Sequence, residues 1–131
     1  MYVSIRKTRE ELYLATREKA ASILPSVYEL RFLKILVEHY DHEASFWVYM
    51  GLRSDYVIIP GTFCSCKDFI IRTAINKTSA YCKHLLGQYI ASREGKYITL
   101  RVSPSEAAGI LLEILNHEYS TTVRKKLGSS K

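Results

Sequence analysis

The chain has 131 residues, of which 47% are hydrophobic and 24% are charged, as in an ordinary folded domain. Nineteen lysines and arginines outnumber thirteen aspartates and glutamates, so the formal net charge is +6. The length excludes a dinucleotide-binding domain joined to a substrate domain, and no apolar run is long enough for a transmembrane helix or a secretory signal. We therefore expect an intracellular protein that is cytoplasmic or, in a eukaryote, nuclear.

Residues 1–43 are expected to form a helical flank. Two capping boxes, each a serine or threonine three residues before a glutamate, favour helix starts. They are Thr8 with Glu11 and Ser26 with Glu29. With Pro25 between them, they predict one helix over 8–24 and a second over 26–40.

The middle of the chain is expected to contain short β-structure followed by helices. Aromatic and β-branched residues predict strands, and turn residues separate them. The expected strands cover 45–52 and 56–59, followed by an extended piece over 62–66, helices over 68–76 and 81–93, and a short strand over 97–102.

The last helix has a strong start signal, because Ser103, Pro104 and Glu106 occupy the N-cap, N1 and N3 positions of a capping box. We expect this helix to run to about Tyr119 or Lys126, within a C-terminal flank over 94–127 that precedes a basic tail over 128–131. The predicted fold class is α+β, a single domain in which a small β-hairpin and knuckle lie between helical flanks.

All three cysteines belong to one pattern that ends in a histidine. Cys64-Ser65-Cys66 is followed by fifteen residues and then by Cys82-Lys83-His84. Cysteines two apart on a strand lie on one face, and the second pair fits the irregular first turn of a helix. Three thiolates and one imidazole are a common closed ligand set for zinc. The sequence therefore predicts a zinc site made by Cys64, Cys66, Cys82 and His84.

Other interpretations of these residues stay open. In the first alternative, the three thiols are buried core residues that bind no metal. In the second, Cys64 and Cys66 form a strained redox disulfide. A different histidine near an apolar helix end, namely His39, His42 or His117, replaces His84 in a third. Asp68 either caps a helix or accepts a hydrogen bond from His84.

The chain lacks the motifs of zinc enzymes. A catalytic zinc keeps one coordination position open for water, and its general base is often the glutamate of an HxE or HExxH motif. Four protein ligands close the predicted site, and neither motif occurs in the sequence. We therefore expect a binding protein and not an enzyme.

Basic residues concentrate around the cysteine pattern. Between Pro60 and Arg101 there are seven basic and two acidic residues, which gives +5 of the net +6. Such an excess is either a solvated face or a surface for polyanions, because lysines and arginines on phosphates release counterions. The candidate nucleic-acid contacts are Lys67, Arg72, Lys77, Lys83, Lys125 and Lys126. Tyr81 and Tyr89 are candidates for stacking with bases, whereas the strand aromatics are expected in the core.

The cysteine pattern and its neighbours resemble the SWIM-type zinc finger, whose ββα unit carries CxC, a variable insert and CxH. The segment from Cys64 to Phe69 resembles the CxCxxF half, and the segment from Cys82 to Leu86 resembles the second half. Lys67 stands where many members have proline. The likeness covers residues 45–92, and we expect the finger over 44–93.

Within that family, the chain is similar to the small stand-alone SWIM proteins of the Shu-type recombination mediators and their archaeal relatives. The resemblance implies a zinc-binding adaptor for a RecA-like recombinase paralogue, with the complex acting on single-stranded DNA during homologous recombination and DNA repair. The alternative is a module that binds single-stranded DNA directly, or a transcription-associated zinc finger.

Overall fold

The computed structural model describes residues 10–13, 20–39 and 43–129. They contain a five-stranded sheet with helices around it, so the predicted α+β class is confirmed. The strands are β1 (Phe32–Glu38), β2 (Glu43–Met50), β3 (Asp55–Ile59), β4 (Phe63–Cys64) and β5 (Ile98–Val102). The helices are η1 (Ala20–Ser22), α2 (Leu24–Tyr28), the π-helix η2 (Phe69–Ile75), α3 (Lys83–Glu94), α4 (Pro104–His117) and α5 (Thr121–Ser129).

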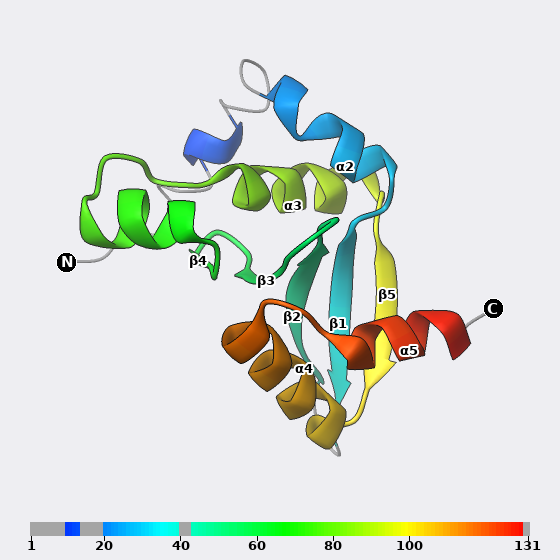
Figure 1. Cartoon of the computed structure of the whole chain (residues 1–131). Helices are drawn as coiled ribbons and strands as arrows, with labels where there is room; N and C mark the ends of the chain where they lie inside the picture. The colour runs from blue at the N-terminus through cyan, green and yellow to red at the C-terminus, as the bar shows by residue number, and fades with distance from the viewer. Residues whose placement is uncertain (1–9, 14–19, 40–42, 130–131) are drawn as a thin grey trace.

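The strands lie in the order β4-β3-β2-β1-β5 (Figure 1). The first four follow one another along the chain and pair antiparallel, whereas β5 pairs with β1 in parallel. A parallel neighbour requires a crossover connection. Here the crossover leaves β4 at one edge, passes through η2 and α3, and reaches β5 at the opposite edge.

The helix predicted over 26–40 is wrong in its greater part. Only α2 is helical, with Pro25 in its first turn, and Phe32–Glu38 forms the central strand β1. This segment reads FLKILVE, a nearly continuous apolar run whose period does not distinguish a buried strand from a buried helix. Pairing with β2 on one side and β5 on the other decides in favour of the strand.

The helix predicted over 8–24 lies partly outside the described residues. Within them, residues 10–13 are helical and η1 is a short 3-10 turn. The remaining expected elements are present with shifted ends, and the short helix expected over 68–76 is the π-helix η2. No helix in the described part of the chain is long and apolar enough to cross a membrane.

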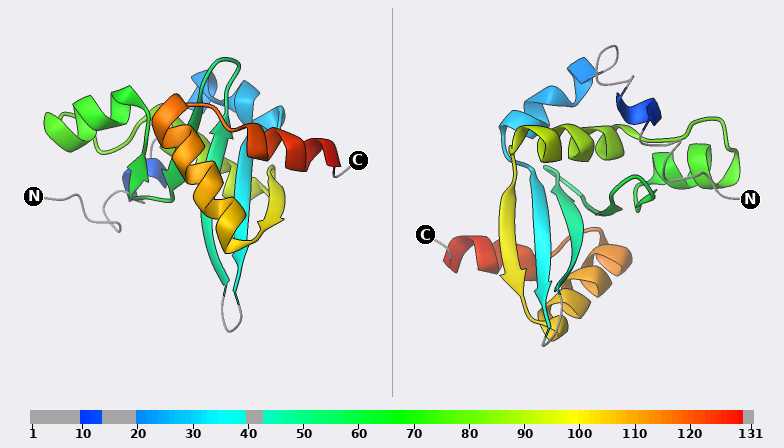
Figure 2. Two further views of the ribbon diagram at one scale, coloured as in Figure 1. Left: turned by 60° about the horizontal axis from the view of Figure 1, so that its bottom comes forward. Right: turned by 180° about the vertical axis from the view of Figure 1, so that it is seen from behind.

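Both faces of the sheet are covered by helices. Successive strand residues point to opposite faces. Phe32, Trp47 and Ile58 pack with α2, α3 and the three cysteines, whereas Leu33, Val48 and their neighbours pack with α4 and α5. Figure 2 (left) shows α4 and α5 in front of the sheet and α2 behind it. The cysteines therefore belong to the core of one face.

The capping box predicted at the last helix is confirmed, but the helix is divided. Glu106 N–H donates to Ser103 Oγ over 3.1 Å, and Ser103 N–H donates to the Glu106 carboxylate over 2.9 Å. The chain leaves α4 at Glu118, which is left-handed with φ of 56°, and begins again as α5. The expected end at about Tyr119 is therefore close to the observed one, and only the alternative of a single helix to Lys126 is wrong.

Helix α5 is attached to β3 by a buried ion pair. Asp55 is fully buried and receives two hydrogen bonds from the Arg124 guanidinium, over 2.6 and 3.1 Å. Ser120 N–H also donates to Asp55 over 2.8 Å, and the Glu113 carboxylate accepts from Ser120 Oγ over 2.7 Å. These polar contacts fix the start of α5 beside the first residue of β3, whereas Cys64 pairs with Ile58 near the other end of that strand.

Gly87 marks the closest contact between α3 and the sheet. A Cβ atom at this position would lie 2.6 Å from Cγ1 of Ile23 and closer still to Cζ of Phe32.

We expect Gly87→Ala to lower the free energy of unfolding by about 1–3 kcal/mol, because the overpacked core must shift. Urea denaturation measures this change. The matched control is Gly109→Ala in α4, where nothing lies within 4 Å and the free energy of unfolding should rise by about 0.5–1 kcal/mol. Equal effects of the two substitutions would contradict the packing argument.

Candidate metal centre

The four predicted ligands come from the end of β4, from the residues that directly follow it and, beyond η2, from the start of α3. Cys64 ends β4, where it pairs with Ile58 of β3, and Cys66 lies in the turn that follows. Cys82 is the N-cap of α3 with extended backbone angles, φ −107° and ψ 172°, and His84 lies in the first turn of α3. The change from extended to helical backbone at Cys82 turns two side chains that are two residues apart toward the same point.

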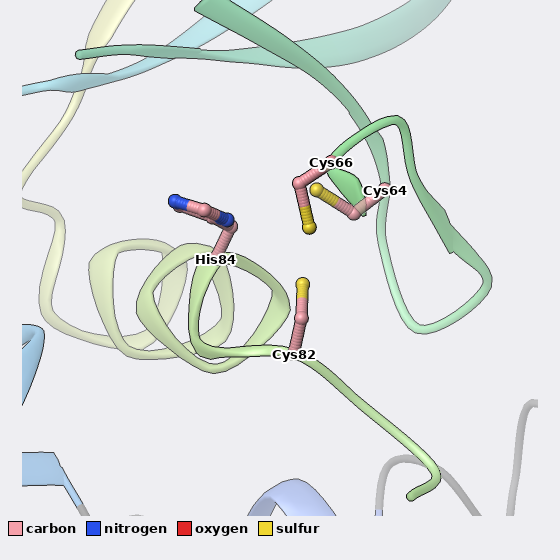
Figure 3. Close-up of side chains that lie close together, drawn as sticks. All are labelled: Cys64, Cys66, Cys82 and His84. Atoms are coloured by element: carbon pink, nitrogen blue, oxygen red, sulfur yellow. The ribbon is translucent and has the colours of Figure 1, made fainter. Parts of the chain in front are cut away.

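The ligand atoms converge in the interior of the protein. Figure 3 shows the three sulfur atoms turned toward one common space, with one nitrogen of the His84 imidazole on the side nearest to them and the other nitrogen pointing away. One ligand atom from each residue lies within 4.8 Å of all the others, and the four side chains are 0–7% exposed. Donor atoms around a tetrahedral zinc, with bonds of 2.0–2.3 Å, lie roughly 3.5–3.8 Å apart. A slight contraction of the cluster therefore gives the geometry of a bound ion.

One nitrogen of the His84 imidazole has an unused lone pair in the interior of the protein. Nδ1 of His84 is buried and has no hydrogen-bond partner, a property it shares with only Thr73 Oγ1 among the buried side chains that the structure describes. Buried polar atoms are nearly always satisfied. A metal ion at the centre of the cluster would use the lone pair of this nitrogen, so the residues present fit a bound metal.

The thiols are close enough to compete for protons. Hydrogen bonds with Cys64 and then with Cys82 lower the pKa of the Cys66 thiol. Hydrogen bonds with Cys66 and Cys82, together with burial, raise the pKa of Cys64. A hydrogen bond with Cys64 lowers the pKa of Cys82, but the hydrogen bond with Cys66 and burial outweigh it and raise the value to about 12. All three thiols become thiolates together only when a cation compensates their charge.

Neighbouring groups hold the ligands in place. Phe69 N–H donates to Sγ of Cys66 over 3.3 Å. Ser65, between the two first cysteines, exchanges hydrogen bonds with the backbone of Val57 over 2.9 and 3.0 Å. The His84 ring packs on the rings of Tyr49 and Tyr56, with centroids 4.6 and 4.9 Å away. Such contacts orient ligands before and during metal binding.

The other candidate ligands that the structure describes are not part of the cluster. His39 follows β1 and His117 ends α4, and both are exposed, whereas His42 lies outside the described residues. Asp68 occupies the N-cap position of η2 without a capping hydrogen bond, and it forms an ion pair with Arg72 over 3.3 Å. Neither predicted role of Asp68 is therefore present. The three cysteines are free, without a disulfide between them.

A groove lies directly beside the cluster. Its volume is about 940 Å³, and Cys66, Cys82 and His84 form part of its wall. Three of the predicted nucleic-acid contacts line it, namely Lys67, Arg72 and Lys83, together with Tyr81. Three further aromatic or basic side chains line the groove and were not predicted from the sequence as site residues, namely Tyr49, Arg53 and Tyr56. They belong to the β2–β3 hairpin, and only the pairing of Tyr49 with Tyr56 shows that the two rings are neighbours.

The six predicted contacts do not form one surface. Lys125 and Lys126 lie on α5, which packs on the opposite face of the sheet, and Lys126 forms an ion pair with Glu106 over 3.1 Å. Lys77 follows η2 and does not line the groove. Tyr89 contacts the guanidinium of Arg93 and packs against the core. The basic residues near the metal ligands are therefore separate from the basic C-terminal helix.

Comparisons of the chain with protein-family models, with curated proteins and with solved structures found no match in any of the three.

The histidines offer a matched test of the centre. We expect the wild-type chain to bind one divalent metal ion, and His84→Ala to lower its affinity by more than about 100-fold, because the substitution removes a ligand. Titration with Co²⁺, followed by its visible absorption, measures the affinity and reports tetrahedral sulfur coordination. The control His117→Ala removes an exposed imidazole and should leave the titration unchanged. Equal cobalt affinity of wild type and His84→Ala would exclude His84 as a ligand.

Proposed function

We propose that the chain is a zinc-binding, non-enzymatic adaptor of the SWIM zinc-finger type. The observation that carries the proposal is the buried cluster of Cys64, Cys66, Cys82 and His84. Three sulfur donors and one nitrogen donor suit zinc better than calcium, magnesium or manganese, which prefer oxygen. Four protein ligands leave no coordination position for water, which is typical of structural zinc sites.

The surroundings of the cluster support a structural role for the metal. Two carboxylates line the neighbouring groove, those of Asp68 and Glu118, and Asp68 is engaged by Arg72. The imidazole of His84, which could otherwise exchange protons with a substrate, is held between two tyrosine rings and 7% exposed. Among the described residues, the engaged Asp68 carboxylate and the packed imidazole support a structural metal more than a general base beside an open metal position.

The adaptor part of the proposal rests on the SWIM motif residues described above. It assigns a RecA-like recombinase paralogue as the partner and homologous recombination as the process. Exposed apolar side chains are compatible with a protein partner, because large apolar groups in water favour association. They include Ile71 and Ile75 on η2, at 49% and 66% exposure, and Leu112 and Leu115 on α4, at 61% and 57%.

Affinity capture tests the adaptor function. We expect the tagged full-length chain, bound to a resin in the lysate of its source organism, to retain a RecA-like paralogue identified by mass spectrometry. Cys82→Ser should release the metal, lower the melting temperature and abolish this capture, because metal binding is coupled to folding. Lys125→Ala, an exposed change on α5, should retain both metal and partner. Capture that never includes such a paralogue would contradict the adaptor function, and unchanged zinc in Cys82→Ser would contradict the zinc centre.

A second candidate function is direct binding of single-stranded DNA. The groove beside the cluster favours it, because cationic and aromatic side chains line the same wall. A transcription-associated zinc finger has no separate observation in its favour.

A further inference from the structure

We propose that the groove beside the metal centre binds single-stranded nucleic acid, with phosphates on Arg53, Lys67 and Lys83 and a base stacked on Tyr81. The proposal deepens the second candidate function by naming its contact residues. It requires the folded metal centre but not the recombinase partner.

The residues that line the groove come from different parts of the chain. One group belongs to the β2–β3 turn, residues 51–54, and another consists of Cys66, the helical residues Lys67 and Asp68, and the start of α3. Its volume of about 940 Å³ lies at the upper end of the range of ligand-binding clefts. Cys66, Cys82 and His84 also line the groove, so the position of both groups of lining residues depends on the same cluster.

Three cations of the groove are available to a ligand. Within the residues that the structure describes, no ion pair involves Arg53, Lys67 or Lys83, whereas Arg72 is engaged by Asp68 over 3.3 Å. All three side chains are exposed. Lys67 and Lys83 each follow a buried metal ligand, Cys66 and Cys82, so their backbone is fixed while their ammonium groups stay in solvent. This is the arrangement that phosphate contacts require.

Tyr81 supplies the aromatic part of the site. Tyr81 is half-buried against the core cluster, like Tyr89, but it also lines the groove and makes no ring contact with another described aromatic residue. Ser79 Oγ donates to the Tyr81 carbonyl over 2.7 Å, which holds the backbone at this point. Tyr49 and Tyr56 lie deeper, against His84, and their rings are already used. Tyr81 is therefore the stacking candidate.

The combination of groups selects the class of ligand. An acidic peptide would satisfy the three cations but would have no use for a tyrosine beside them. Unpaired bases stack on aromatic rings while their phosphates contact lysines and arginines, and this pairing is typical of single-strand binding. A base in a duplex is already stacked and paired, so duplex DNA cannot use Tyr81 in the same way.

Charge reversal tests the phosphate contacts. We expect the full-length protein to bind a fluorescein-labelled oligothymidylate at low salt, measured by anisotropy, with affinity falling as salt increases. Lys83→Glu should lower this affinity about tenfold and decrease the salt slope by about 0.7, the value of one phosphate contact on a single strand. The matched control Lys125→Glu, with the same charge change on α5, should alter the affinity less than about twofold. No binding by wild type at low salt, or equal losses in the two variants, would overturn the proposal.

Substitution of the ring tests the stacking contact. Tyr81→Ala should weaken oligothymidylate binding by about tenfold, whereas Tyr81→Phe retains the ring face and should bind like wild type. An abasic oligonucleotide should bind wild type and Tyr81→Ala equally weakly. Competition by poly-glutamate as effective as that by unlabelled oligothymidylate would assign the groove to polyanions in general and overturn the nucleic-acid proposal.

Two measurements separate failure of the groove from failure of the metal centre. Metal content and melting temperature of each groove variant should equal those of wild type, which shows that a lost affinity is not caused by unfolding. If oligothymidylate binding is absent while the recombinase paralogue is still captured, the groove proposal alone is wrong. If Cys82→Ser keeps its zinc, the zinc centre itself is wrong, whatever the oligonucleotide does.

Discussion

The convergence of three thiols and one imidazole in an apolar core is the constraint on which this part of the protein depends. Cys64, Cys66 and Cys82 are 0–3% exposed within the cluster formed with α2 and α3. Buried thiolates are unfavourable unless a cation compensates them. The elements around them are weak on their own, because β4 has two residues and η2 is a π-helix. A metal ion would therefore organise a region that backbone hydrogen bonds alone define poorly.

The grouping of the four candidate ligands and the start of α4 could be predicted because their signals are local. The CxC and CxH spacings place each pair on one side of a strand or a first helical turn, and the structure brings all four side chains together. The Ser103–Glu106 capping box is likewise a contact between residues three apart. In each case the sequence contains both partners of the interaction within a few positions, so no knowledge of the tertiary fold is needed.

The central strand and the distribution of cations could not be predicted in the same way. The central strand Phe32–Glu38 is covered on both faces of the sheet, so its apolar residues do not alternate with polar ones. Only its pairing with β2 and β5 determines that it is a strand and not a helix. The order of basic residues along the chain does not show which of them are neighbours in space. The fold places Arg53 in the same groove as the candidate metal ligands and leaves Lys125 on the opposite face of the sheet. Likewise the buried pair of Asp55 and Arg124 joins residues from distant parts of the sequence.

The position of the cysteines within the crossover affects how β5 comes to pair with β1. The parallel pairing of β1 with β5 closes the long connection from one edge of the sheet to the other, and closing a long loop is entropically costly. A metal held by Cys66 and Cys82 would join two points of that connection separated by fifteen residues. It would act as a reversible cross-link that shortens the effective loop, comparable with a disulfide over the same span, which contributes about 3 kcal/mol. The ion would then influence the order in which strands assemble as well as the stability of its own site.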